Sequence, residues 1–428
     1  MGRDHRSSND NSLAEKCARI AAIEAEKAAA RGTFGVGGLL IENRTGKVLK
    51  RAANKAITER KDAAIDPTAH VEKQLVDWYY YHYCCHLPKK DDDAALPLSP
   101  PLDAGMTIVC SLDPCIMCTG AILGAGLNMI RISDDPECGV SCRGHDDLTT
   151  LPEGVRQEKA ARFSAFGLRG KRPFAGSQRS IFSGSEIDPI FEKRSTRAFK
   201  AGLDKVRSCL NRDWQTLGNL ENPRLLAKKE DYSSRSSYLV ETFKRYNPQV
   251  FSEKHILEQG MPGIALGQML IAKAKESSTK TGVFNSACII DPFGNILLAT
   301  GANPAKKTPL LDIMRGYYSL ANAVGEEGRR YLAHPKHCKI SILFGPTSDP
   351  TGLMEVGALG SFFEGKLPEN TSGQLEYIIP RQDSSRLEGM LRSLPPFYSE
   401  TVDLPKAIRQ TQDNALRELC EARTLQSA

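Results

Sequence analysis

The sequence of 428 residues has no long apolar run and no regular spacing of cysteines. No stretch approaches the roughly 20 apolar residues that a membrane span needs, and the first residues lack the apolar core of a secretory signal. Its twelve cysteines are scattered along the chain, unlike the dense spacings of a disulfide framework. These absences favour a reducing compartment, so we expect a protein of the cytosol or nucleus that has no membrane partner.

A strong charge of one sign is also lacking, because the formal net charge is only +6. That value alone does not indicate nucleic-acid binding. Most of the excess lysine and arginine lies in residues 153–212, and the middle of this segment, residues 167–177, is rich in glycine and has little periodicity. This composition predicts a flexible linker. The segment is either a solvated tether or a basic strip that contacts phosphates, with phenylalanines available to stack on bases.

Two short motifs place the residue types of a catalytic zinc site at the spacing that such a site needs. The first is His70-Val71-Glu72, and the second, about forty residues later, is Pro114-Cys115-Ile116-Met117-Cys118. A catalytic zinc takes three protein ligands and keeps one position open for water, and His70, Cys115 and Cys118 supply three ligands. Glu72 remains for proton transfer. Either motif alone is common, but together and in this order they form the signature of zinc-dependent nucleobase deaminases.

The residues around both motifs closely resemble the branch of the cytidine-deaminase-like superfamily that contains the tRNA adenosine deaminases and guanine deaminases. The resemblance is carried by residues 66–72 and 107–118, and it extends over roughly residues 12 to 135. It implies a three-layer α-β-α fold with a mixed central sheet, a bound Zn²⁺ and hydrolytic deamination of a nucleobase. It also implies that Asn54 hydrogen-bonds the substrate. Asp113 is the second candidate for substrate binding; it stands where the family commonly has Glu before Pro-Cys, and its shorter side chain puts in doubt any role of that Glu in substrate selection.

The local pattern agrees with this fold. Residues 12–30 predict a helix with an apolar stripe, and residues 35–41 and 48–52 flank a turn as a hairpin. We expect the first zinc helix to begin at Thr68 and a buried strand at residues 107–112. A second helix is expected to begin at Asp113-Pro114, so that its two cysteines lie one turn apart.

Two further groups of cysteine and histidine have the residue types of a metal site but not the complete ligand pairs of a structural zinc. One is His82-Tyr83-Cys84-Cys85-His86. The other combines Cys138, Cys142 and His145. We expect ordinary packing or surface roles for both groups, and a second structural zinc is the alternative.

The second half of the sequence repeats the order of features found in the first. Residues 283–299 repeat the hairpin pattern, Asn303 follows it much as Asn54 follows the first hairpin, and residues 309–314 and 341–354 align with the two motif regions. In this alignment the histidine, the glutamate and the two cysteines are replaced. The replacements, in that order, are Asp312, Met314, Thr351 and Met354. We therefore expect a second copy of the fold that lacks the zinc ligands and the proton shuttle. This arrangement resembles that of eukaryotic wobble-adenosine deaminases, where the catalytic subunit pairs with a related inactive one.

The sequence predicts four regions: a catalytic domain at 1–150, a basic linker at 151–240, a degenerate deaminase-like domain at 241–383 and a helical extension at 384–428. The expected activity is hydrolytic deamination of adenosine to inosine in tRNA, with Glu72 as the proton shuttle. The alternatives are a free base or nucleoside, cytosine in single-stranded DNA or RNA, or a non-catalytic RNA-binding scaffold. The expected partners are tRNA and, within the chain, the second copy as a pseudo-dimer.

Overall fold

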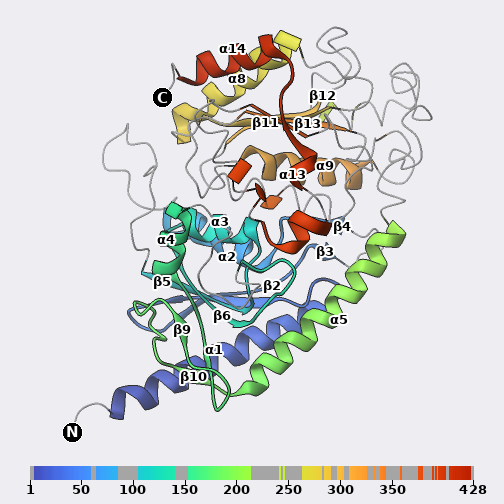
Figure 1. The fold of residues 1–428 in the computed structure, drawn as a ribbon. Coiled ribbons are helices and arrows are strands. Elements are labelled where there is room, and N and C mark those ends of the chain that lie inside the picture. The colour runs from blue at the N-terminus through green and yellow to red at the C-terminus, as the bar shows by residue number, and fades with distance from the viewer. Residues whose placement is uncertain are drawn as a thin grey trace. The chain divides into compact units, whose positions relative to one another are not determined.

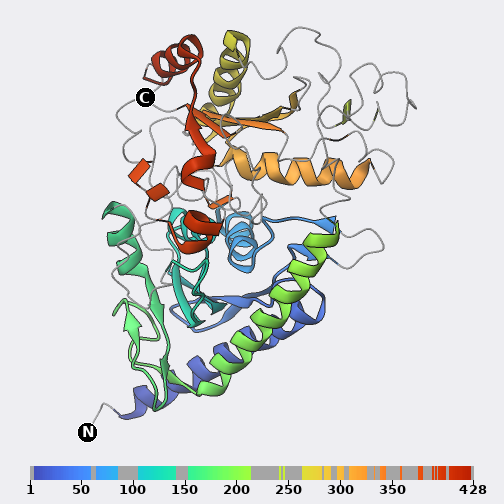
Figure 2. The same ribbon diagram turned by 45° about the vertical axis from the view of Figure 1, so that its right-hand side comes forward.

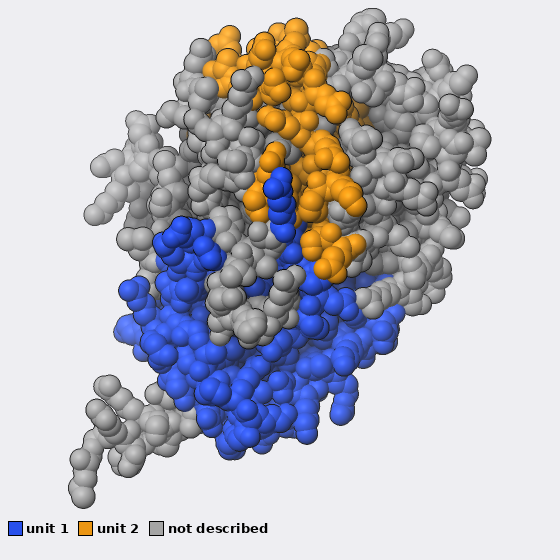
Figure 3. Space-filling model, in the orientation of Figure 1, with its two compact units in different colours: residues 1–207, 349–357, 392–397 blue, residues 208–348, 358–391, 398–428 orange. Residues whose placement is uncertain are grey.

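The computed structural model divides the chain into two compact units (Figure 3). The first contains residues 1–207, 349–357 and 392–397, and the second contains residues 208–348, 358–391 and 398–428. No helix in the described part of the chain is both long and apolar enough to cross a membrane. The structure describes residues 4–58, 64–84, 105–140, 153–213, 241, 244–245, 263–281, 284–290, 296–302, 308–324, 332, 338–343, 357–358, 375–378, 388–389, 391–392, 394–401 and 404–425.

The first unit is built on a mixed six-stranded sheet with the strand order β2-β1-β5-β6-β7-β9 (Figure 1). β1 is antiparallel to both β2 and β5, and β5, β6 and β7 are parallel. Every residue of the three parallel strands is buried, as expected of parallel strands, which are usually covered on both faces. The strands are β1 (Gly37–Glu42), β2 (Val48–Ala53), β5 (Met106–Leu112), β6 (Asn128–Ser133), β7 (Phe163–Ala165) and β9 (Ala175–Gly176).

Helices lie on both faces of this sheet. α1 packs against β1 and β5 on one face, while α2 and α3 lie on the other. The predicted three-layer α/β architecture with a mixed sheet is therefore confirmed for this unit. The helices are α1 (Asp4–Ala30), α2 (Val71–Tyr79), which continues into the π-helix η1 (Tyr80–Cys84), α3 (Ile116–Gly124) and α4 (Glu153–Arg162).

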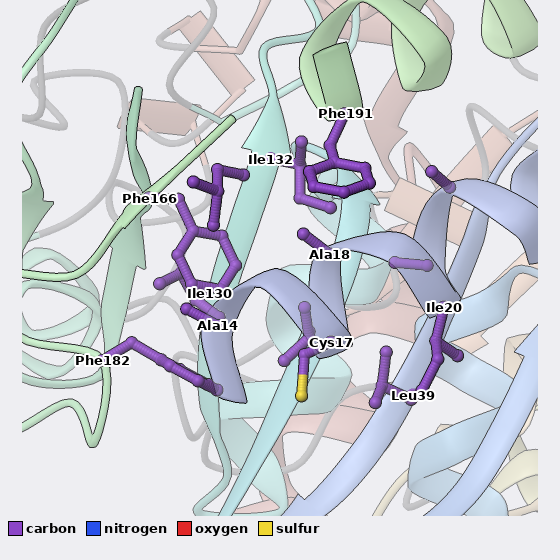
Figure 4. Close-up of a cluster of buried hydrophobic side chains, with 14 of the residues drawn as sticks. Ala14, Cys17, Ala18, Ile20, Leu39, Ile130, Ile132, Phe166, Phe182 and Phe191 are labelled. Carbon is purple, nitrogen blue, oxygen red and sulfur yellow. The ribbon is translucent and has the colours of Figure 1, made fainter. Parts of the chain in front are cut away.

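The core between α1 and the sheet is formed by small residues of the helix and large residues of the strands (Figure 4). Ala14, Cys17 and Ala18 face Leu39 on β1 and Ile130 on β6, and all five are fully buried. The small side chains allow a close approach of helix and sheet. At Gly37 an added Cβ would lie 2.2 Å from the backbone nitrogen of Ala25, so this glycine is required by packing.

A second long helix, α5 (Pro189–Asp213), packs beside α1 (Figure 2). Ala198 meets the loop that enters β1 so closely that a Cβ on Gly35 would lie 1.9 Å from its carbonyl oxygen. Arg194 donates two hydrogen bonds to the carboxylate of Glu26, at 2.7 and 2.8 Å. α5 thus packs against the Gly35 loop, in which the ring of Phe34 lies 6.1 Å from the ring of His70.

Residues 167–177 are ordered structure and not the flexible linker that their composition predicted. β8 (Gly167–Leu168) pairs with β10 (Glu186–Ile187), and β9 joins the main sheet. Phe166 is fully buried against Phe182, with ring centroids 5.1 Å apart. Gly170 and Gly176 have φ angles of +69° and +100°, which L side chains rarely adopt. Gly170 makes a tight turn, and Gly176 ends β9 where a Cβ would lie 2.4 Å from the carbonyl oxygen of Phe163, so the glycines reflect backbone geometry and not flexibility.

The second unit contains a five-stranded sheet with the strand order β12-β11-β13-β14-β15. Its first three strands are antiparallel neighbours, and β13, β14 and β15 are parallel. The β11–β12 hairpin has an irregularity between Ile289 and Ile290, and the β1–β2 hairpin has one between Leu40 and Ile41. The strands are β11 (Ser286–Ile290), β12 (Ile296–Gly301), β13 (Lys339–Leu343), β14 (Leu375–Ile378) and β15 (Ile408–Gln410).

Helices also cover this second sheet. α8 and α14 share a core with β11 and β13, and α9 packs against β11 and β12. α14 and β15 lie within the predicted C-terminal extension, where they add a helix and a strand to the unit. The predicted domain boundaries stay predictions. The remaining elements are α8 (Gly263–Thr281), α9 (Pro309–Ala323), η4 (Phe397–Thr401), α13 (Leu404–Ala407), α14 (Asn414–Leu425) and the short pair β3 (Ile57–Thr58) and β4 (Ala64–Ile65).

Candidate active site

His70 lies at the N-cap of α2, immediately before the helix begins at Val71. The prediction that this helix begins at Thr68 was wrong by three residues. Asp66 accepts hydrogen bonds from the backbone N–H and the hydroxyl of Thr68, at 3.0 and 2.6 Å. This local turn competes with helical geometry, and the helix starts only where the N–H of Gln74 reaches the carbonyl of His70, at 3.0 Å.

Cys115 occupies the corresponding position before α3. It is the N-cap residue of that helix, and its carbonyl accepts the N–H of Thr119 at 2.8 Å. Cys118 lies in the first turn of α3, but the helix begins at Ile116 and not at Asp113-Pro114, as was predicted. The preceding loop is held by Val140, whose N–H donates to the carbonyl of Pro114 at 3.2 Å. Both cysteines are thus placed by the start of one helix and by a second loop.

The structure brings His70, Cys115 and Cys118 together. Nδ1 of His70 lies 3.6 Å from the Sγ of each cysteine, and one donor atom from each of the three residues lies within 4.8 Å of the others. Nitrogen and sulfur ligands at about 2.1 and 2.3 Å from a tetrahedral zinc lie about 3.6 Å apart. The donor types and their separation therefore fit a zinc ion, which this set of residues is able to hold with one position left open.

The electrostatics of Cys115 agree with a metal site. The Cys118 thiol donates to Cys115, and His70 lies close to it, so the pKa of Cys115 lies well below its usual value although burial opposes the change. A low pKa favours the thiolate, which is the form that binds metals. Both sulfur atoms also lie near helix N-termini, whose exposed N–H groups favour negative charge.

Glu72 lies beside this group in the first turn of α2, with 4% of its surface exposed. Burial raises the pKa of its carboxyl, and the negative charge of Cys115 raises it further, while His70 opposes the rise. A carboxyl shifted in this direction exchanges a proton more readily near neutral pH. Oε1 of Glu72 lies 3.4 Å from Sγ of Cys110 on β5.

Asn54 lies directly after β2, in a buried position. Its Oδ1 accepts hydrogen bonds from the Thr33 hydroxyl at 2.7 Å and from the N–H of Ala56 at 2.8 Å. These two bonds direct the amide nitrogen of Asn54 away from both donors. The segment is tied to the start of α2 by Gln74, whose amide donates to the carbonyls of Ala53 and Ala69 at 3.0 and 2.8 Å.

Asp113 is buried beneath the loop that carries Cys115. Its carboxylate lies 3.8 Å from Arg131, and an added Cβ on Gly139 would lie 2.4 Å from its Oδ2. Gly139 in turn forms an isolated β-bridge with Cys115. Asp113 therefore contributes to the support of the cysteine loop, while its contact with substrate stays a prediction.

Asp135 and Thr33 support the site, and the sequence motifs did not identify them. Asp135 accepts the N–H groups of Glu137 and Cys138, both at 3.1 Å, and so shapes the loop that reaches Cys115. Burial raises its pKa to about 7. The spacing Asp-x-Glu-Cys was a possible signal of such a turn, but only the fold places this turn against Pro114.

No other group of metal-ligating residues comes together in the described ranges. Cys138 is half-buried and His82 is exposed; the latter stacks on Trp78 with ring centroids 4.2 Å apart. Cys85, His86, Cys142 and His145 lie outside the described residues, and the side chain of Cys84 is not described. The expectation about a second zinc is therefore untested.

The layered fold and the Cys₂His group with an adjacent glutamate define a zinc-binding domain of the deaminase class. Residues 11–133 match the sequence model of the family described as "Cytidine and deoxycytidylate deaminase zinc-binding region". The likeness to this family lies within the first unit.

The structure is also similar to one solved in a study of A-to-I editing by tRNA:A34 deaminases at the wobble position of transfer RNA. The two chains are 23% identical, the match covers 29% of this chain and 81% of that one, and the TM-score is 0.22. No curated protein matches the sequence.

Proposed function

We propose that this protein is a zinc-dependent hydrolytic deaminase of a nucleobase. The observation that carries the proposal is the group of His70, Cys115 and Cys118, whose N and S atoms are separated by 3.6 Å, with the buried Glu72 beside it. In this proposal His70, Cys115 and Cys118 hold the ion. Bound zinc supplies Lewis-acid activation of a water molecule.

Glu72 is assigned the proton transfers. It accepts one proton from the attacking water and delivers it to the ring nitrogen, and it then takes the second proton from the newly added hydroxyl group and delivers it to the departing amine. The balance is one water consumed, one C–N bond broken, one C–O bond formed and one ammonia released. The raised pKa of the Glu72 carboxyl supports this role because the group must both accept and donate a proton.

Asn54 is assigned to the substrate. Its Oδ1 is engaged by Thr33 and Ala56, so its NH₂ group is the part of the side chain available to donate to an acceptor on the base or sugar. Asp113 was expected to share this role. Its position beside Arg131 supports a role in holding the cysteine loop instead.

The substrate that we propose is adenosine in tRNA, on the basis of the resemblance of residues 66–72. Many cations of the predicted basic strip have partners within the unit, which weakens the strip as a phosphate-binding surface. Arg169 lies 2.9 Å from Glu15, and Arg172 lies 3.1 Å from Asp134. Recognition of RNA therefore requires other surfaces as well.

We also propose that the second unit is a degenerate copy of the first. The strand orientations and the position of the hairpin irregularity support this. Each unit also has a backbone hydrogen bond directly after its hairpin. In the first unit the N–H of Asn54 donates to the carbonyl of Val36 at 2.9 Å, and in the second the N–H of Ala302 donates to the carbonyl of Asn285 at 3.1 Å. In the proposed copy, this register gives Ala302 the position of Asn54, one residue before the Asn303 of the sequence alignment.

The predicted replacements are consistent with an inactive copy. Met314 is fully buried in α9, and Asp312 lies in the first turn of that helix. Asn303, Thr351 and Met354 lie outside the described residues. α9 begins at Pro309, whereas the aligned Pro67 lies in the turn before α2, so the two helices start at different points of the alignment.

The test is a substrate panel. Wild-type protein and Glu72→Ala are incubated with tRNA, single-stranded RNA and DNA, and free nucleosides and bases, and the products are separated by mass spectrometry. Inosine in tRNA from the wild type alone is the expected result. Uracil or xanthine would instead assign a different base, and zinc-loaded wild type that releases no ammonia from any substrate would favour a binding or scaffold protein.

A further inference from the structure

Cys110 is a buried thiol that lies beside the proposed proton shuttle. It is at the centre of β5, with none of its surface exposed. Its Sγ lies 3.4 Å from Oε1 of Glu72, within the range of a hydrogen bond donated by sulfur. β5 also leads into the loop that ends at Cys115, so the strand that contacts the glutamate also helps to position a zinc-site ligand.

A buried carboxylate needs donors, because its oxygen atoms have lost water. The thiol of Cys110 is a weak donor, but hydrogen bonds to a charged acceptor are stronger than neutral ones. Burial raises the pKa of Cys110 well above its usual value, and the charge of Glu72 acts in the same direction. The sulfur therefore stays protonated and is able to donate.

The corresponding positions of the second unit differ at both residues. Gly38 pairs with Cys110 in the first sheet, and Ala287 pairs with Ile342 in the second. Ile342 therefore stands in the register position of Cys110, while the sequence alignment places Met314 at Glu72. In the proposed inactive copy, apolar side chains therefore stand at the positions of both the thiol donor and the carboxylate acceptor.

We propose that Cys110 is a positioning residue, whose S–H group holds the carboxylate of Glu72 in the orientation needed for proton transfer. The proposal rests on the catalytic role proposed for Glu72. Cys110 does not touch the substrate in this account. It removes rotational freedom from the carboxylate, so its loss affects the chemical step and not substrate binding or zinc binding.

The kinetic test compares Cys110→Val, which keeps the volume but removes the donor, with Cys110→Ser, which keeps a donor. The matched control is Cys17→Val, a buried cysteine of α1 on the other face of the sheet. Loss of one hydrogen bond to a charged group predicts a drop in kcat of about tenfold for Cys110→Val. KM and zinc content should match the wild type, and Cys110→Ser should recover most of the loss.

An infrared measurement reads the contact without turnover. The S–H stretching band of Cys110 is obtained as the difference between wild-type and Cys110→Val spectra. The same difference is then recorded in a Glu72→Ala background, where the band should move to higher frequency because the acceptor is gone. An unmoved band, or a kcat for Cys110→Val equal to that of Cys17→Val, would overturn the proposal. Wild type without turnover on any substrate of the panel would overturn the proposed function, and the positioning role with it.

Discussion

Asp135 offers a prediction of pH-dependent stability with a worked sign. It is 4% exposed, and burial raises its pKa from 3.8 to about 7. The folded protein therefore binds a proton here more tightly than the unfolded chain. The contribution of Asp135 to the free energy of unfolding is greatest below pH 4, and it falls as the pH rises from about 4 to about 7.

The magnitude follows from the size of the shift. A pKa change of about three units corresponds to about 4 kcal/mol at 1.36 kcal/mol per unit. Asp135→Asn keeps Oδ1 as the acceptor for the N–H groups of Glu137 and Cys138 but does not ionise. We therefore expect the variant to be more stable than wild type at pH 8, by up to about 4 kcal/mol, and to lose about three-fifths of that advantage by pH 5.

The neighbouring Asp134 is the control. Burial opposes its ionisation, but Arg131 and Arg172 together lower its pKa. Its contribution is present above pH 4 and is lost only as the pH falls below that value, so Asp134→Asn should destabilise the protein equally at pH 5 and pH 8.

The assay is urea unfolding of the zinc-loaded protein at pH 5, 6, 7 and 8. The chain has two tryptophans, so a Trp214→Phe background leaves Trp78 on α2 as the fluorescent reporter. At each pH, the free energy of unfolding of the variant is compared with that of the wild type. The effects of pH on zinc binding are common to both proteins and cancel in this difference. A difference for Asp135→Asn that is constant from pH 5 to pH 8 would refute the reasoning.

Three further predictions concern packing and metal binding. Gly35→Ala should lower stability by about 1–3 kcal/mol, since its Cβ would meet the carbonyl of Ala198; thermal unfolding measures the loss, and an unchanged Tm would contradict the close packing of α5. Phe166→Ala should cost about 3–5 kcal/mol by removing a buried ring packed on Phe182, as measured by urea unfolding, whereas a cost below 1 kcal/mol would restore the linker interpretation. Cys118→Ser should reduce the zinc content measured by mass spectrometry at least tenfold, and stoichiometric zinc would exclude this cysteine as a ligand.

Much of the first unit could be predicted because its chemistry requires fixed residue types at fixed spacings. A zinc site needs its histidine and cysteines at the starts of two helices, and the hairpin at Gly37–Glu42 and Val48–Ala53 follows from alternation around a turn. The predicted hairpin and the buried strand at residues 107–112 are confirmed, with boundaries that differ by no more than two residues.

The remaining features depend on contacts between residues that are distant in the sequence. The approach of Cys110 to Glu72 comes from packing of α2 on β5, and that of Asp113 to Arg131 from the parallel pairing of β5 and β6. Nothing in the local pattern of either strand specifies these pairs. The glycines near Phe166 suggested flexibility, because composition does not distinguish a tight turn from a tether.

The central claim is that Glu72 performs proton transfer at a zinc site made by His70, Cys115 and Cys118. The most direct test is ammonia release by zinc-loaded wild type and by Glu72→Gln, on the substrate that the panel identifies, with the zinc content of both proteins measured in parallel. The account predicts one zinc per chain in both proteins and a loss of turnover of at least a thousandfold in the variant, toward the upper end of the usual contribution of acid–base catalysis, roughly 10²–10⁴. Equal turnover at equal zinc content would contradict it.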